Sequence, residues 1–257
     1  MAFLKSLGEI ELMAEAGQIL ARVIRELVEH AKIGTTTNFL DKLSFELIES
    51  NKAKPAFLGY RPAGAKRPFP KTLCASVNEV VVHGLPSDYC LQNGDLLKID
   101  LGLEYQGFFV DSAITVGVGR ISRKARKLIE VTRNSLDLAI KNLSPGLTLG
   151  DIGYTIENYA RKNKFSIIRS LTGHGIGRQL HEEPTVLNFG KPNTGLELVP
   201  GMVLAIEPMI SLSNLDNGCN IQELKDGSYA TKDKSLSAHF EHTVAITEAG
   251  PRVLTRL

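Results

Sequence analysis

The amino-acid sequence predicts an α+β fold, in which an antiparallel sheet carries helix pairs on its outer face. Two observations lead to this class. Helix-like and strand-like segments occur in blocks, in the order αα–β–αα–β, so the two kinds of element segregate. The helix pairs also resemble each other at an offset of 112 residues. This repeat predicts a single domain, residues 1–257, made of two halves related by an internal pseudo-two-fold, although two amphipathic helix pairs also match by chance.

Four helices are expected. Residues 8–31 have apolar residues at helical spacing and predict an amphipathic helix. In residues 32–52 a glycine stop and a threonine cap precede a second helix, and residues 121–164 repeat the arrangement of helix, glycine–threonine junction and helix. The positions that match at the offset of 112 are Gly34 and Gly146, Thr36 and Thr148, Leu40 and Ile152, and Asn51 and Asn163.

Strands are expected in runs that are rich in β-branched and apolar residues. These runs are residues 72–84, 95–119, 201–212 and 241–250. The run 95–119 predicts a hairpin whose turn lies in the sequence EYQG. Segment 60–71, with three prolines and a glycine, is expected to be the longest irregular stretch.

Composition restricts the class of function. Of the 257 residues 43% are hydrophobic and 23% are charged, as expected for a globular protein that buries a sizeable core. A formal net charge of +2 is too small to indicate a DNA or membrane partner. Cys74, Cys90 and Cys219 are odd in number and lack CxxC spacing, which argues against a disulfide framework. Because no secretory signal or membrane segment is visible either, we expect a cytoplasmic protein.

Acidic residues in apolar strand contexts are the most informative feature. If Tyr105 and Gln106 form the two-residue turn, Asp100 and Asp111 lie directly opposite each other, with Cβ atoms about 5 Å apart. Both aspartates follow apolar runs, which predicts that they are buried. Buried carboxylates are costly unless they are neutralised or bind metal. The two interpretations are therefore a solvated hairpin and a divalent cation between the aspartates.

Two glutamates and a histidine extend this set. Glu207 lies in MVLAIEPMI, Glu241 lies in SAHFEHTVAI, and His174 stands in the glycine-rich sequence TGHGIG. Four carboxylates and a neutral imidazole carry a charge that two divalent ions would neutralise and one would not. Such hard ligands, without a thiolate, favour Mn²⁺, Fe²⁺ or Co²⁺, with Zn²⁺ as a further candidate.

Six motifs occur in the order and spacing of one known family. They are NEVVVHGLP, KIDLG, FVDSA, TGHGIGRQLHEEP, AIEPM and FEHTV. On these motifs the chain resembles the type I methionyl aminopeptidases over essentially its whole length. The resemblance implies a pita-bread fold with two pseudo-symmetric halves. It also implies a dinuclear metal site that activates a hydroxide to remove the initiator methionine from nascent proteins during translation, with small second residues favoured.

The resemblance assigns the metal ligands. Asp111 and Glu241 would bridge two divalent ions and Asp100 would chelate one of them, while His174 and Glu207 would complete the shell of the other.

The resemblance also assigns catalytic roles and a further ion. His181 would face the substrate carbonyl and stabilise the oxyanion. His83 would contact the substrate amine or the scissile nitrogen, and Glu207 would carry a proton to the leaving nitrogen. A monovalent cation would bind the main-chain carbonyls near Asn78, Val80 and Ser237.

The methionine pocket that the resemblance implies comprises Tyr60, Phe69, Cys74, Val82 and Leu180. The sequence departs from the expected bacterial pattern at Val82, where cysteine is frequent, and at Leu180, where an aromatic residue is frequent. It contains no tryptophan, so Ser228 or Tyr229 stands in the region of the usual capping indole. A mostly apolar pocket nevertheless suits a flexible thioether.

The expected partner is the N-terminus of a nascent polypeptide, with transient ribosome contact as a second, and the chain is expected to be a monomer without an N-terminal zinc-binding extension. Two competing interpretations are a proline-specific peptidase of the same fold and a non-catalytic binding module that has lost its metal ligands. The separation of 33 residues between His174 and Glu207 favours type I over type II. His239 would share the strand face of Glu241, while Glu182 and Glu183 would anchor their loop.

Overall fold

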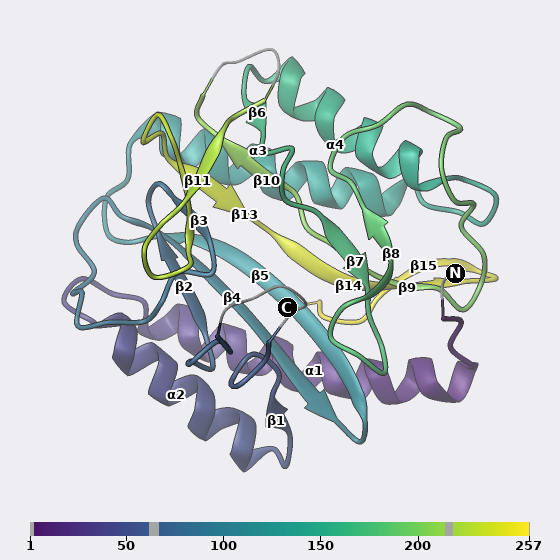
Figure 1. Cartoon of the computed structure of the whole chain (residues 1–257), viewed down its shortest axis with the longest axis horizontal. Coiled ribbons are helices and arrows are strands. Elements are labelled where there is room, and N and C mark those ends of the chain that lie inside the picture. Colours follow the sequence, from purple (N-terminus) through teal and green to yellow (C-terminus); the bar gives the residue numbers. More distant parts are fainter. Residues whose placement is uncertain (1–2, 62–66, 214–217, 257) are drawn as a thin grey trace.

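The computed structural model describes residues 3–61, 67–213 and 218–256, and they form an α+β fold (Figure 1). The four expected helices are confirmed as α1 (Leu7–His30), α2 (Thr37–Ser50), α3 (Arg123–Lys141) and α4 (Leu149–Lys162). Helix α1 begins with a capping box, in which Ser6 and Glu9 exchange side-chain to main-chain hydrogen bonds. Residues 62–66, inside the segment expected to be irregular, lie outside the described residues.

The residues that match at the offset of 112 occupy equivalent places in the two helix pairs. Thr36 and Thr148 are the N-caps of α2 and α4, and Asn51 and Asn163 are their C-caps. Both helices have 14 residues. A glycine with positive φ makes the turn two residues before each N-cap. The turn glycine, the N-cap threonine and the C-cap asparagine therefore occupy the same positions in both helix pairs.

The main sheet of the described chain has nine strands, all in antiparallel pairings. In spatial order its path is β1 (Lys54–Pro55), β4 (Leu96–Tyr105), β5 (Phe108–Gly117), β14 (Glu241–Thr247), β9 (Val203–Ile206), β7 (Gly173–Gly175) and β8 (Glu182–Val186). Outside this path β2 (Cys74–Val77) pairs with β4 and β15 (Gly250–Val253) pairs with β14. The predicted strand runs are all represented in this sheet or beside it.

Two smaller sheets lie beside the main one. The first consists of β13 (Ser237–His239), β10 (Met209–Ser211) and β6 (Ser166–Ile167). The second consists of β11 (Ile221–Glu223), β12 (Tyr229–Thr231) and β3 (Val80–Val82). In the chain, β10 directly follows β9 and β13 directly precedes β14, so the first small sheet continues from strands of the main sheet.

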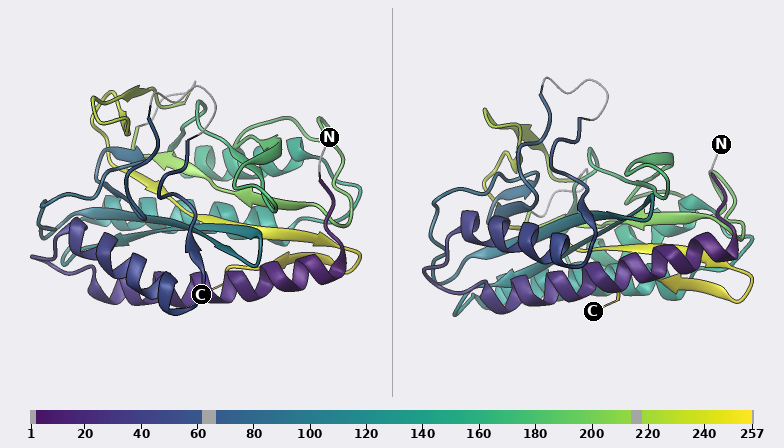
Figure 2. Two further views of the ribbon diagram at one scale, coloured as in Figure 1. Left: turned by 60° about the horizontal axis from the view of Figure 1, so that its bottom comes forward. Right: turned by 90° about the horizontal axis from the view of Figure 1, so that it is seen from below.

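The helices cover one face of the sheet, as predicted, while loops and small sheets stand on the other face (Figure 2). Helices α1 and α2 pack against β4 and β5 in one apolar cluster, which includes Met13, Leu20 and Leu101. Helices α3 and α4 form a second cluster with the strands near β14, including Leu128 and Val244. Burial of these apolar faces holds the helices to the sheet. The opposite face is left for polar groups.

The register of the β4–β5 hairpin differs from the prediction. Asp100 pairs with Ala113 and Asp111 pairs with Gly102, so the aspartates are diagonal neighbours on one face and do not lie directly opposite each other. The turn is made by Gln106 and Gly107, whose φ values are 52° and 84°. A tight hairpin turn of this type needs positive φ at both central residues, which a glycine accepts readily and Tyr105 would resist. The turn therefore moves one residue toward the C-terminus.

The three cysteines are free thiols, which agrees with the prediction that no disulfide framework exists. Cys74 and Cys219 are buried and Cys90 is exposed. None of the helices in the described ranges has the length and apolar character needed to cross a bilayer.

Candidate metal centre

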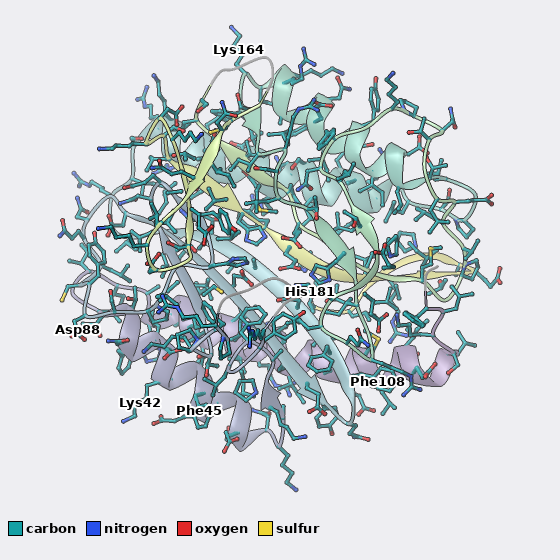
Figure 3. All side chains as sticks on the ribbon, viewed as in Figure 1. Lys42, Phe45, Asp88, Phe108, Lys164 and His181 are labelled. Atoms are coloured by element: carbon teal, nitrogen blue, oxygen red, sulfur yellow. The ribbon has the colours of Figure 1, made fainter. Side chains whose placement is uncertain are left out.

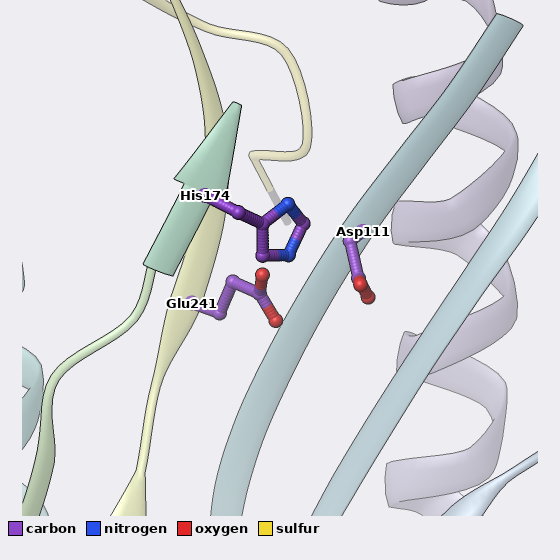
Figure 4. Close-up of side chains that lie close together, drawn as sticks. All are labelled: Asp111, His174 and Glu241. Atoms are coloured by element: carbon purple, nitrogen blue, oxygen red, sulfur yellow. The ribbon is translucent and has the colours of Figure 1, made fainter. Parts of the chain in front are cut away.

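Three predicted ligands from three different strands converge on one point. Asp111 on β5, His174 on β7 and Glu241 on β14 each offer one ligand atom, and these atoms lie within 4.8 Å of one another. Their polar ends project into the space between the strands (Figure 4). The two carboxylates are buried, and the histidine is partly buried.

Two carboxylate oxygens in this group lack hydrogen-bond partners. Asp111 Oδ1 and Glu241 Oε1 are buried and accept no hydrogen bond from the protein. An unpartnered buried carboxylate oxygen is costly, and a cation is the compensation that proteins generally use. The donor set of two carboxylates and one imidazole suits a divalent ion, so the residues present fit a metal site.

The environment of His174 prepares its ring for metal binding. Nδ1 donates a hydrogen bond to the main-chain oxygen of Gly175 at 2.8 Å, which leaves Nε2 with a free lone pair. Burial lowers the pKa of His174 to about 4, so the ring is neutral near pH 7. The flanking residues must be small, because a Cβ on Gly173 or Gly175 would clash with a neighbouring main-chain oxygen. The glycines around this histidine therefore allow close backbone packing.

Glu207 lies next to this group, directly after β9. Its Oε1 is 3.6 Å from His174 Nε2, and its Oε2 is 3.4 Å from His239 Nε2. Burial lowers the pKa of both histidines, to about 4 and about 3, so neither contact is an ion pair near neutral pH. A neutral ring nitrogen and a carboxylate oxygen at such distances are placed to share a cation or a proton.

Asp100 is buried on β4, on the same sheet face as Asp111. Burial and the charge of Asp111 raise its pKa well above the usual value. Burial followed by the charges of the other acids likewise raises the pKa of Glu207 and Glu241 well above the usual value, and burial raises that of Asp111 to about 7. Asp100 and Glu207 do not belong to the tight group of three, and their role as ligands stays a prediction. Without a cation, all four carboxyls are therefore harder to ionise than ordinary carboxyls.

Binding of a divalent ion is therefore expected to release protons at about pH 6. Asp111, with a pKa of about 7, holds its proton under these conditions, whereas His174, with a pKa of about 4, has none to release. Calorimetric titration with Mn²⁺ in two buffers of different ionisation enthalpy measures the number released. We expect about one proton or more per ion at about pH 6 and fewer at about pH 8. Zero release at both pH values would contradict the assignment of these acids as ligands.

His181 lies beside the group of three. Its ring centre is 4.3 Å from that of His174, and its Nδ1 shares a hydrogen bond with the Tyr60 hydroxyl at 2.6 Å. His181 is exposed at the surface, yet desolvation by the surrounding protein, and then the neighbouring histidines His174 and His83, lower its pKa to about 3. In Figure 3 His181 lies near the middle of the face in view. When the Tyr60 hydroxyl donates to Nδ1, the neutral ring of His181 carries its proton on Nε2, where it can be donated.

His83 follows β3 in a left-handed backbone conformation, with φ of 59°. Burial lowers its pKa, and its charge would in turn lower the pKa of both His181 and His239. His83 is therefore close enough to His181 and His239 for its charge to affect the pKa of both. The ring of His83 meets that of Tyr229 edge-on, with centres 5.8 Å apart. Of the two residues Ser228 and Tyr229, it is therefore Tyr229 whose ring contacts His83.

The predicted pocket residues fall into two apolar clusters. Tyr60, Phe69, Cys74 and Leu180 belong to the cluster under α1, with Cys74 and Leu180 buried and the two aromatic residues partly exposed. Val82 belongs to a separate small cluster that also includes Tyr229. Cys74 is the cross-strand partner of Asp100, which places this end of the first cluster next to the acids. Their contact with a substrate stays a prediction.

Comparison with known proteins decides the family. The profile of metallopeptidase family M24 matches residues 11–248. The chain belongs to metallopeptidase family M24. This M24 peptidase is 43% identical to a methionine aminopeptidase of Clostridium perfringens over 256 residues, which cover 99% of both chains. It is 41% identical to methionine aminopeptidase 1 of Bacillus subtilis over 258 residues, which cover 100% of both chains.

Solved structures agree with these relatives. The crystal structure of methionine aminopeptidase from Rickettsia prowazekii matches with a TM-score of 0.93 at 39% identity, covering 100% of both chains. A prolidase from Pyrococcus horikoshii matches with a TM-score of 0.75 at 25% identity, and the match covers only 64% of that chain. The M24 peptidase is thus a metal-dependent aminopeptidase of the pita-bread fold, and its predicted resemblance to the type I methionyl aminopeptidases is confirmed.

The structure places His239 in the centre, next to Glu207, which the sequence did not reveal. His239 is buried with neither ring nitrogen hydrogen-bonded, and it lies 3.4 Å from Glu207. Sequence alternation placed it only on the strand face of Glu241, two residues away. The contact arises because β13 ends at His239 and β14 begins at Glu241, so the chain changes sheets between them. The alternation was a usable signal, but it did not reveal Glu207 as the neighbour.

Glu182 anchors the loop of the M24 peptidase that carries His181. Its Oε2 accepts a hydrogen bond from Lys5 Nζ at 2.5 Å, and both side chains are almost completely buried. Its other oxygen accepts from the main-chain N–H of Gln179. Glu183 is exposed. Lys5 thus connects the segment before α1 to the loop next to the centre.

Proposed function

We propose that this M24 peptidase removes the N-terminal methionine from nascent polypeptides. Relatives that match nearly the whole chain at about 40% identity carry the name methionine aminopeptidase. The observation that carries the proposal is the convergence of Asp111, His174 and Glu241 on one point, with unpartnered carboxylate oxygens. Beside this point, the partly exposed ring of Tyr60, which contacts His181, offers an apolar surface for a thioether.

In this proposal two divalent ions are held by five residues, namely Asp100, Asp111, His174, Glu207 and Glu241. These residues would hold the ions, for which Mn²⁺, Fe²⁺, Co²⁺ and Zn²⁺ are the candidates. When bound, the ions supply a hydroxide at neutral pH for attack on the first peptide bond. Two ions also bring enough positive charge to let four buried carboxyls ionise together.

The protein's own residues orient the substrate and move the proton. In this proposal the Tyr60 hydroxyl donates to Nδ1 of His181, so the Nε2–H of the neutral ring can donate to the carbonyl oxygen as it becomes negative. His83 contacts the amine or the scissile nitrogen. Glu207, whose carboxyl lies between His174 and His239, takes a proton from the attacking water and returns it to the leaving nitrogen.

The remaining features of the proposal concern specificity and setting. Tyr60, Phe69, Cys74, Val82 and Leu180 bind the methionine side chain, and a small second residue is favoured. The chain acts as a monomeric single domain of two pseudo-symmetric halves in the cytoplasm, and it contacts the ribosome transiently.

Peptide cleavage tests the proposed function directly. Protein loaded with Mn²⁺ or Co²⁺ is expected to release methionine from Met-Gly-Met-Met and to spare both an Xaa-Pro dipeptide and the formylated form of the same peptide. The formyl group removes the free amine that the site is proposed to recognise. Release of free methionine is quantified by chromatography, with chelator-treated protein as the control. Preferential cleavage of Xaa-Pro would instead establish a proline-specific peptidase, and no cleavage of any peptide would favour a binding module.

Replacing Tyr60 by phenylalanine is expected to lower kcat/KM about 5-fold, because one hydrogen bond worth about 1 kcal/mol is removed from Nδ1 of His181. The aromatic ring stays, so methionine binding is retained and most of the loss falls on kcat. Steady-state kinetics on Met-Gly-Met-Met measure the effect. Tyr154→Phe is the matched control, because Tyr154 is exposed on α4. A loss confined to KM would assign Tyr60 to the pocket alone.

A further inference from the structure

A fully buried lysine lies two residues from Asp100, on the same strand as this residue of the candidate centre. Lys98 on β4 has 0% of its surface exposed. Its Nζ donates hydrogen bonds to the main-chain oxygens of Asn78, at 2.6 Å, and Ser237, at 3.3 Å. Within the described residues it forms no ion pair with a carboxylate. The amino group is therefore held by peptide carbonyls, as a bound ion would be.

The oxygens around Lys98 come from separate segments and are drawn together by further contacts. The Ser237 hydroxyl donates to the oxygens of Asn78 and Val80 at 3.2 and 3.4 Å. Asn78 has a positive φ of 54°, which turns its carbonyl at the β2–β3 junction. Burial lowers the pKa of Lys98 to about 7, while Glu79 and Asp95 act to raise it. Two carbonyl acceptors also favour the protonated amine.

Lys98 connects three backbone segments, and each of them carries a residue of the candidate centre a few positions away. On β4, Lys98 is two residues before Asp100 and on the same face. Ser237 begins β13, which ends at His239 and is followed by Glu241. Asn78 precedes β3, which ends next to His83. One amino group thus ties together the three backbone segments that carry these side chains.

We propose that Lys98 is a positioning residue whose amino group serves as a built-in cation, taking the place of a dissolved monovalent ion among these carbonyls. Converging peptide carbonyls are the ligands with which proteins bind K⁺. The same oxygens were expected from the sequence to hold such an ion, and two of them accept hydrogen bonds from Lys98. With the lysine in place, the centre keeps its geometry whatever monovalent salt is present. This inference rests on the proposed function only for its activity readout.

Removal of the lysine side chain is expected to create a need for K⁺. In Lys98→Ala the carbonyls keep their places around an empty space, so Tm of metal-free protein should be about 4 °C or more higher in KCl than in tetramethylammonium chloride of equal concentration. Cleavage of Met-Gly-Met-Met should likewise rise about 10-fold in KCl for this variant. The unaltered protein should show no preference between the two salts.

Two further variants separate this role from ordinary packing. Lys98→Met fills the space with an uncharged chain, so it should lose activity without recovery in KCl. Lys5→Met removes another buried lysine, whose partner is the Glu182 carboxylate, and should be destabilised equally in both salts. If Lys98→Ala does not fold during expression, its refolding yield in the two salts gives the same comparison.

Equal Tm values or refolding yields of Lys98→Ala in the two salts would overturn the inference, as would a K⁺ requirement of the unaltered protein. Because Tm is measured without divalent metal or substrate, this result is independent of the peptide assay. Failure to cleave methionine would count against the proposed function while the Tm comparison still tested Lys98.

Discussion

Replacement of Glu241 by glutamine is expected to lower kcat/KM for Met-Gly-Met-Met by about 10³-fold. Glu241 and Asp111 provide the buried, unpartnered oxygens at the point where His174 also converges. A neutral amide at position 241 removes one negative charge from the group that is proposed to hold the ions. Metal content, measured by elemental analysis after dialysis against Mn²⁺, should fall together with activity.

The same substitution should have the opposite effect on the metal-free protein. Burial raises the pKa of Glu241 well above its usual value, so an ionised Glu241 destabilises the folded state at about pH 8. Removing that group should raise Tm in the presence of a chelator by about 2–4 °C. Glu248→Gln is the matched control, because Glu248 is exposed in the turn after β14 and should change neither quantity. Normal activity of Glu241→Gln with a full metal content would contradict its role as a ligand.

Replacement of Glu207 by glutamine is expected to lower kcat by about 10²–10⁴-fold while the fold is retained. The carboxyl of Glu207 lies between His174 and His239 and has a strongly raised pKa. An amide has similar size and can still contact both rings, but it cannot accept and return a proton. Single-turnover measurements with saturating Mn²⁺ separate the loss in the chemical step from any loss in metal affinity.

Glu183→Gln is the control for Glu207, since Glu183 is exposed on β8 and the substitution should leave kcat unchanged. Near-normal turnover of Glu207→Gln, with its metal content verified, would remove Glu207 from proton transfer. A variant that instead loses metal but recovers activity at high Mn²⁺ would assign Glu207 to metal binding alone.

Local signals in the sequence predicted the helices well. The glycine and threonine ahead of α2 and α4, and the asparagine at the end of each, act through hydrogen bonds and backbone angles within a few residues. The acidic residues in apolar runs were also recognisable, because a buried carboxylate needs compensation whichever strand carries it. Asp111, His174 and Glu241, which the structure brings together, are three of the five ligands in the predicted set.

Longer-range features were less accessible. The hairpin register was wrong because one positive-φ glycine, Gly107, decided where the turn lay. The contact of His239 with Glu207 and the carbonyl ligands of Lys98 depend on how β13, β4 and the β2–β3 junction pack together. No spacing along the chain encodes those distances.

The sequence by itself determined the fold class, the four helices with their caps, and the set of acids and histidines that would be costly to bury without a cation. These depend on periodicity, backbone preference and the desolvation of charge, which are properties of short segments and single residues. Only the tertiary structure decided which of these side chains meet and which tautomers their hydrogen bonds select. It also placed Lys98 among main-chain carbonyls, because contacts between strands far apart in the chain arise only when the helix pairs pack onto the sheet.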